Sequence, residues 1–192
     1  MRQKTLSIEQ IVLCGMFAAL VATGAFIKIS IPVQPFPMHF TLQFFFVLLA
    51  AFVLGGKLGS ASVLAYLVIG LVGVPVFAAG GGPAYLVRPT FGFLLGFAFA
   101  AYAMGKVCEI LHSSKIRTWI LAAAIGYVIY YGTGILYFYF ITHFIVVTPN
   151  TVGWAAIFAV YCLPTMFPDG LLCILAIMLA ARLRPVVSQM LS

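Results

Sequence analysis

Residues 40–75 read FTLQFFFVLLAAFVLGGKLGSASVLAYLVIGLVGVP, in which Gly55-Gly56-Lys57 separates two apolar runs and Gly73-Val74-Pro75 ends the second. Glycine and proline interrupt helices, and a helix needs about 20 apolar residues, with a lower limit of about 17, to cross a bilayer. The stretch predicts two membrane-spanning helices, over residues 40–54 and 61–72, both short of this limit and joined by a tight turn.

The rest of the chain has the same apolar character. Of its 192 residues 65% are hydrophobic and 7% are charged, whereas a soluble domain averages about 45–50% apolar and about 25% charged. The mean hydropathy is +1.20. This composition excludes a soluble domain, a disordered chain and a disulfide-rich secreted scaffold. It predicts an all-α membrane protein with one integral membrane domain over residues 1–192.

The other apolar runs raise the predicted number of crossings to six. The last run, residues 152–183, would span about 48 Å at 1.5 Å per residue, against a hydrocarbon core of about 30 Å. Pro164 and Pro168 each remove a backbone donor, so we expect a short interfacial helix over 152–161 before the sixth crossing. The remaining helices are expected at residues 8–29, 90–110, 118–142 and 168–183.

The net charge of +7 carries a topology signal. Six crossings place both termini on one side, and eight of the ten basic residues fall on that side, which the positive-inside rule makes cytoplasmic. A nucleic-acid partner is not expected, because its footprint would be a clustered basic face. The eight residues are Arg2, Lys4, Lys57, Lys106, Lys115, Arg117, Arg182 and Arg184.

The long irregular segments all fall on the opposite, outer side. They cover residues 30–39, 73–89 and 143–151, and nine of the ten prolines lie in this half of the molecule. Non-helical backbone at membrane depth survives where it is buried in protein or lines a cavity. We therefore expect an outward-facing pocket with a lid, and Gly81 and Gly82 in the glycine run would let the backbone approach a ligand closely.

Polar and aromatic residues in this half are the candidate ligand contacts, each with a simpler alternative. Asp169 is a ligand or a helix N-cap, and Arg88 binds a carboxylate or anchors a lipid headgroup. Thr41 and Gln43 contact the ligand or hydrogen-bond a neighbouring helix. An apolar pocket wall, or else an interfacial aromatic belt, would be formed by Phe77, Tyr85, Phe91, Phe93 and Trp154.

Enzymatic chemistry is not supported. The chain has no HExxH, GxSxG or Walker motif, and its three acidic residues do not form a catalytic pair. It offers no metal site and no cofactor site, and it cannot hydrolyse ATP itself. A channel is also disfavoured, because no selectivity filter or array of gating charges is present.

Several blocks of the sequence resemble the BioY family, the biotin-specific S components of energy-coupling factor (ECF) transporters. The resemblance covers the chain from end to end, and the order and spacing of the blocks are more specific than any one of them. The blocks are PVQPFP at 32–37, TLQ at 41–43, LGGKLG at 54–59, YLVIG at 66–70, GVPVFA at 73–78, GGG at 80–82 and PTFGFLLGF at 89–97.

The resemblance implies an S-component-like bundle of six helices with long irregular outer loops, in a prokaryotic cell membrane. Such a subunit captures biotin outside the cell with high affinity. It then docks on a transmembrane coupling subunit that two ATPase subunits drive, so ATP is used by the partners and no cofactor is bound here. The family's docking seam, often AxxxA, corresponds to Gly15, Ala18, Ala19 and Ala22; ordinary helix packing within the chain is the alternative.

The last helix departs from the family pattern of a proline, an aspartate and a lysine one turn later. Here the stretch is Pro168-Asp169-Gly170-Leu171-Leu172-Cys173, without a lysine. The resemblance implies that Asp169 accepts the ureido N–H groups of biotin, and we hypothesise that Arg88 pairs with the biotin carboxylate or with Asp169. The missing lysine leaves open a related vitamin as the substrate; a stand-alone membrane channel or enzyme is the remaining alternative.

Overall fold

The computed structural model describes residues 6–34, 36–111, 116–146 and 152–190. In these residues, five helical stretches are long and apolar enough to cross a membrane. The elements are α1 (Ile8–Phe26), β1 (Lys28–Ile31), β2 (Met38–Thr41), α2 (Gln43–Val72), the 3-10 helix η1 (Pro83–Val87), α3 (Phe91–Ile110), α4 (Ile116–Phe140), the π-helical turn η2 (Ile141–Ile145), α5 (Trp154–Ala156), the π-helical turn η3 (Ile157–Cys162) and α6 (Leu163–Met190).

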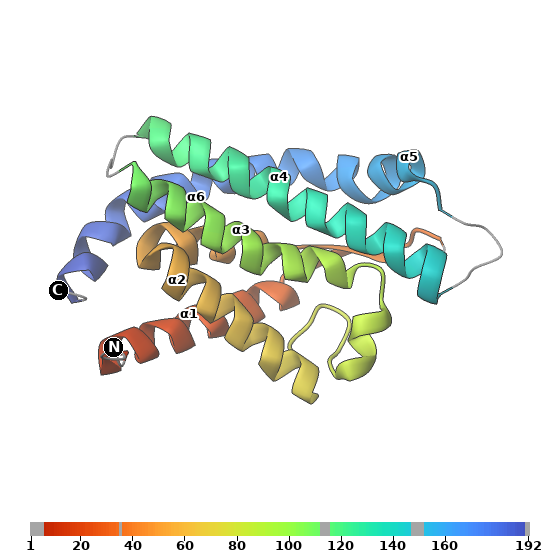
Figure 1. The fold of residues 1–192 in the computed structure, drawn as a ribbon, viewed down its shortest axis with the longest axis horizontal. Coiled ribbons are helices and arrows are strands. Elements are labelled where there is room, and N and C mark those ends of the chain that lie inside the picture. The colour runs from red at the N-terminus through yellow and green to blue at the C-terminus, as the bar shows by residue number, and fades with distance from the viewer. Residues whose placement is uncertain (1–5, 35, 112–115, 147–151, 191–192) are drawn as a thin grey trace.

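The long helices lie side by side along the long axis of the molecule (Figure 1). α2 packs against α1, α3 and α6, and α3 packs against α4. α1 begins and α6 ends at one end of the bundle, here called the terminal end. The η1 segment lies at the opposite end, here called the loop end. Of the predicted irregular segments, residues 73–89 lie at this loop end, residues 143–145 are helical, and residues 147–151 lie outside the described part of the chain.

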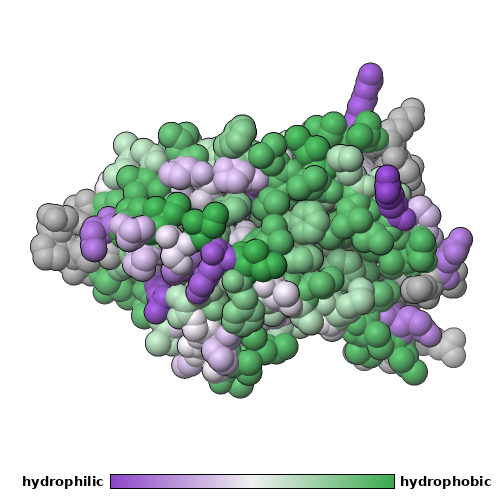
Figure 2. All heavy atoms as spheres, turned by 180° about the vertical axis from the view of Figure 1, so that it is seen from behind, coloured by the Kyte–Doolittle hydropathy of each residue, from purple (hydrophilic) through white to green (hydrophobic). Residues whose placement is uncertain are grey.

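The surface has the character of a membrane protein. Figure 2 shows apolar residues over the middle of the molecule, with hydrophilic side chains gathered toward the two ends. The exposed side chains include Val68 on α2, Val128 on α4 and Met178 on α6, each 59% exposed or more. Because soluble proteins rarely expose contiguous apolar surface of this kind, this belt is the part that faces lipid.

The helix α2 reverses direction at Gly55, whose φ of 84° and ψ of 178° are not helical. A Cβ added to Gly59 would lie 3.0 Å from the Cα of Ala51, whereas eight residues of straight helix span about 12 Å. The two halves, residues 43–54 and 56–72, thus fold back on each other. The break lies where the sequence predicted it, but the first half is only 12 residues long, so helix length alone does not establish six crossings.

Glu109 of α3 holds this turn in place. Its Oε1 accepts the Gly56 N–H at 2.9 Å, and its Oε2 accepts Lys106 Nζ at 2.6 Å. The turn also lies directly against α3, because a Cβ on Gly105 would come within 2.5 Å of the Gly55 carbonyl carbon. Gly55 therefore meets two requirements that glycine satisfies best, a positive φ and a neighbour at close range.

The prediction for the last apolar run was wrong. One helical stretch continues from Trp154 to Gln189, with no separate interfacial helix over 152–161, and Pro168 lies inside α6. Membrane helices tolerate proline where π turns and neighbouring side chains satisfy the freed backbone groups. Here the π turn η3 directly precedes the part of α6 that carries Pro164 and Pro168.

The expected irregular segment at 30–39 is also more ordered than predicted. β1 and β2 form an antiparallel hairpin in which Lys28 pairs with Thr41 and Ile31 pairs with Met38. α1 consequently ends at Phe26, short of the predicted residue 29. Alternating β-branched residues in β1 favour a strand, and Pro32 and Pro37 lie between the strands, where no ladder donor is needed.

Candidate binding site

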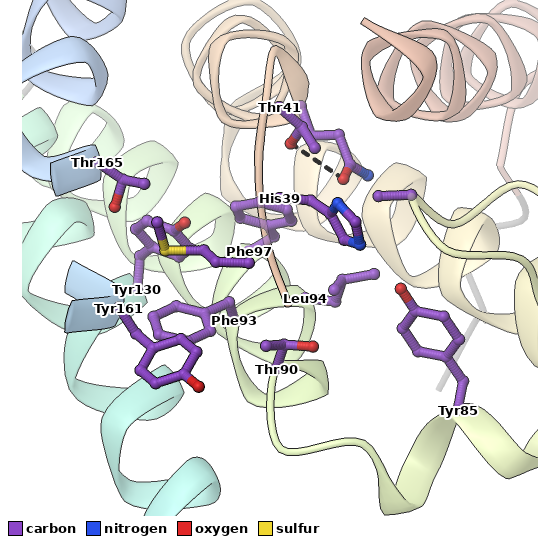
Figure 3. Close-up of a pocket in the computed structure, with 13 residues that line it drawn as sticks. His39, Thr41, Tyr85, Thr90, Phe93, Leu94, Phe97, Tyr130, Tyr161 and Thr165 are labelled. Atoms are coloured by element: carbon purple, nitrogen blue, oxygen red, sulfur yellow. Dashed lines mark hydrogen bonds between the residues drawn. The ribbon is translucent and has the colours of Figure 1, made fainter. Parts of the chain in front are cut away.

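A pocket of about 570 Å³, counting its open mouth, lies among the hairpin, the η1 segment, α3, α4 and the start of the last helical stretch (Figure 3). Thirteen residues line it: Met38, His39, Thr41, Gln43, Ala78, Tyr85, Thr90, Phe93, Leu94, Phe97, Tyr130, Tyr161 and Thr165.

Aromatic rings form much of the wall. Phe97 stacks on Tyr130 with ring centroids 5.0 Å apart, and Phe93 meets Tyr130 edge-on at 5.7 Å. Phe44 lies behind them and stacks on Tyr130 at 4.6 Å. Rings held on both sides keep a fixed position, so this wall is a preformed surface for an apolar ligand body.

Thr41 and Gln43, both predicted site residues, line the pocket together. Thr41 Oγ1 donates to Gln43 Oε1 at 3.2 Å, and Gln43 Nε2 donates to the Tyr66 hydroxyl at 2.7 Å. The dashed line in Figure 3 marks the first of these bonds. Each amide atom of Gln43 keeps capacity for a second hydrogen bond, so the amide is oriented by the fold and still able to bind a ligand.

Asp169 lies one layer behind the pocket lining. It is 2% exposed, and its Oδ2 accepts the Tyr131 hydroxyl at 2.6 Å. The Tyr131 hydroxyl also lies 2.9 Å from Oγ1 of Thr165, which does line the pocket. Asp169 is the seventh residue of α6 and not its N-cap, so the capping alternative was wrong. Among the described residues the only side-chain ion pair joins Lys106 to Glu109, so no Arg88–Asp169 pair is present there.

Arg88 lies at the mouth of the pocket and is exposed. Its guanidinium carbon sits 4.9 Å from the ring centroid of Tyr85, a lining residue. Burial lowers the pKa of His39 below its usual value, and the positive charges of Lys28 and Arg88 lower it further. Lys28 Nζ donates to the Ala78 carbonyl. Two cations therefore flank His39 at the mouth, where they favour a negatively charged group.

Four further predicted residues support the pocket without lining it. Phe77 is 1% exposed and packs against Tyr85 with centroids 4.6 Å apart, while Phe91 is fully buried. Gly82 donates its N–H to the Gly70 carbonyl at 2.7 Å, which ties the glycine run, Gly81 included, to α2. These residues hold Tyr85 in place.

A model of the BioY family matches residues 1–189. The chain belongs to the BioY family. It is 42% identical to the "Probable biotin transporter BioY" of Lysinibacillus sphaericus, over 95% of this chain and 88% of that relative. It is 34% identical to the protein of the same description from Pyrococcus horikoshii, over 92% of this chain and 96% of that relative.

The fold agrees with BioY membership. The structure is similar to a crystal structure described as the S component for biotin from an ECF-type ABC transporter, with a TM-score of 0.78. The sequences are 21% identical, and the match covers 94% of this chain and 95% of that one. Together with the five long apolar helices, this likeness identifies a multi-pass membrane protein with the S-component fold.

The BioY docking seam predicted on α1 is divided by the fold. Gly15 and Ala19 are exposed, and a Cβ on Gly15 would meet nothing within 4 Å. Ala22 is half-buried, and Ala18 is 6% exposed and packs in the core of this chain. The exposed face therefore runs through Gly15 and Ala19, and the alternative of packing within the chain holds for Ala18.

Sequence reasoning missed several lining residues of this BioY pocket. Tyr130, Tyr161 and Thr165 were not named, and His39 was assigned no role. One signal was available, because Tyr127, Tyr130 and Tyr131 recur at helical spacing in an apolar segment, where polar groups need partners. Whether these tyrosines face the pocket depends on how α4 packs against the other helices.

Proposed function

We propose that this chain captures biotin from the extracellular side and serves as the substrate-specific subunit of an ECF-type transporter. Membership of the BioY family along almost the whole chain supports the assignment. The observation that carries it is the pocket at the loop end, which combines a fixed aromatic wall with a positively charged mouth. Biotin has the matching parts, a compact ring system and a flexible chain that ends in a carboxylate.

The pocket suggests how biotin lies in it. In Figure 3, Tyr130, Tyr161 and Thr165 lie on one side of the pocket and Tyr85 on the other. We place the ring system against Tyr130, near the Thr165–Tyr131–Asp169 group, and the carboxylate toward Tyr85 and Arg88. The Thr165–Tyr131–Asp169 group then contacts the ureido group of biotin, and the positive charge at the pocket mouth neutralises the biotin carboxylate. Since no lysine follows Asp169 in this chain, whereas the family usually has one a turn later, a related vitamin with the same layout is the second candidate substrate.

The biotin role is tested by titrating biotin into the detergent-purified chain. We expect nanomolar binding, weakened about fivefold or more by Arg88→Ala, because the ligand loses a charge-assisted partner. Lys57→Ala is the matched control, since it removes one exposed cation beside the Gly55 turn, away from the pocket. Affinity within twofold of the parent would remove Arg88 from the site. No binding of biotin by folded protein would point to another vitamin.

We further propose six crossings, counting the two halves of α2 separately, with both termini in the cytoplasm. The positive-inside rule supports this orientation, because the described basic residues on the terminal side, such as Lys106 and Arg182, outnumber Lys28 and Arg88 at the loop end. The loop-end pocket then opens to the outside.

The partners are a transmembrane coupling subunit and two ATPase subunits, with docking through Gly15 and Ala19. Gly15→Leu should abolish biotin uptake by the assembled transporter and leave biotin affinity of the isolated chain unchanged, because the added side chain blocks close helix approach. Gly132→Leu on α4 is the control, since a Cβ there also meets nothing within 4 Å. Normal uptake by Gly15→Leu, or an equal loss in both variants, would refute docking through this face.

A further inference from the structure

A second hollow lies at the terminal end, between the first turns of α4 and the last turns of α6. It measures about 640 Å³, counting its open mouth, and is lined by Trp119, Ala181, Arg184, Pro185 and Ser188. None of these residues lines the loop-end pocket. The proposed biotin function makes no use of them.

Two hydrogen-bond donors in this hollow have no partner in the part of the chain that the structure describes. Trp119 Nε1 and Arg184 Nη1 are both buried and form no hydrogen bond with any described residue, and Trp119 as a whole is 3% exposed. Ser188 is already engaged, because its hydroxyl donates to the Pro185 carbonyl at 2.8 Å. Buried donors without partners are rare in native proteins, and an acceptor from outside the chain would satisfy both.

The two donors are held in place by stacking. The Trp119 indole stacks on Phe52, with centroids 5.7 Å apart and planes 8° from parallel. The Arg184 guanidinium carbon lies 5.8 Å from the centroid of Trp119. The nearby carboxylate of Glu109 is occupied by Lys106 and the Gly56 N–H. In the described part of the chain Arg184 therefore has no neutralising partner, and both free donors favour a negatively charged acceptor.

The surroundings of the hollow favour a lipid. Ile116 and Ile120 flank Trp119 in α4 and are 61% and 55% exposed, and Val186 beside Pro185 is 53% exposed. Basic pockets between helices at the cytoplasmic surface of a membrane suit phosphate headgroups. We propose that Trp119 Nε1 and Arg184 bind a phosphate oxygen of an anionic phospholipid, whose acyl chains cover the adjoining apolar surface.

The test compares lipid binding by matched variants of the full chain in neutral detergent. Dioleoyl phosphatidylglycerol should raise the melting temperature of the parent saturably, and dioleoyl phosphatidylcholine should not. Arg184→Gln and Trp119→Phe should each raise the half-saturating lipid concentration about tenfold, as expected for loss of a hydrogen bond to a charged group. Trp119→Phe removes the indole N–H and keeps an aromatic ring stacked on Phe52. The control is Arg182→Gln, which removes the same charge from an exposed position on the same helix.

A second measurement needs no substitution in the hollow. The chain has two tryptophans, so Trp154→Phe leaves Trp119 as the only indole, and phosphatidylglycerol should shift its emission saturably. If Arg182→Gln loses lipid binding to the same extent, the effect depends on net charge alone and the proposed site is refuted. Unchanged binding by Arg184→Gln or Trp119→Phe, or no shift in Trp119 emission, would also overturn it. If inorganic phosphate binds as tightly as the lipid, the anion site stands and its assignment to a lipid is wrong.

Discussion

Asp169→Asn is expected to weaken biotin binding by at least tenfold, or about 1.4 kcal/mol. Asp169 is the buried acceptor at the end of the pocket where we place the ureido ring, and it is joined to the lining through Tyr131 and Thr165. Hydrogen bonds to charged groups contribute about 1.5–3 kcal/mol, and asparagine keeps the size of the side chain while removing its charge. Isothermal titration of the variant beside the parent measures the change.

The connection through Thr165 has a matched control. Thr165→Val and Thr142→Val each remove a buried hydroxyl that donates to a backbone carbonyl of its own helical stretch, at 3.0 Å and 2.9 Å. Only Thr165 lines the pocket, so only its variant should lose affinity. Full affinity in Asp169→Asn, with a loss confined to thermal stability, would make Asp169 a structural partner of Tyr131 and not a determinant of biotin binding.

Gly55→Val is expected to lower the free energy of unfolding by about 3 kcal/mol or more. A non-glycine residue at positive φ costs roughly 1–3 kcal/mol, and the new Cβ would lie 2.8 Å from Glu109 Oε1, the acceptor that holds the turn. The two costs add because the valine strains its own backbone and displaces the carboxylate. Reversible unfolding in mixed micelles measures the difference.

Gly132→Ala is the control for this substitution. Gly132 lies inside α4, and a Cβ there meets nothing within 4 Å, so alanine should leave stability unchanged or raise it by up to about 1 kcal/mol. Equal stability of the two variants would mean that the reversal of α2 does not depend on glycine at position 55.

Part of the site was predictable because it lies next to local signals. Thr41, Gln43 and Tyr85 adjoin the proline and glycine segments that predicted an outer pocket, and all three line it. Tyr130 offered only the tyrosine spacing within α4, and Thr165, although it follows Pro164, lies inside a long apolar run. Their place in the lining depends on which helix faces α4 and the start of α6.

The amino-acid sequence by itself determined the membrane class, the irregular segment at residues 73–89 and the break at Gly55. These features follow from local properties, namely apolar content, helix breakers and the charge at helix ends. Only the tertiary structure decided that the last helix continues past Pro164, that Ala18 packs inward while Ala19 faces outward, and that Asp169 lies behind the lining. Each of these depends on partners distant in the sequence, since burial and hydrogen bonding are settled where helices meet.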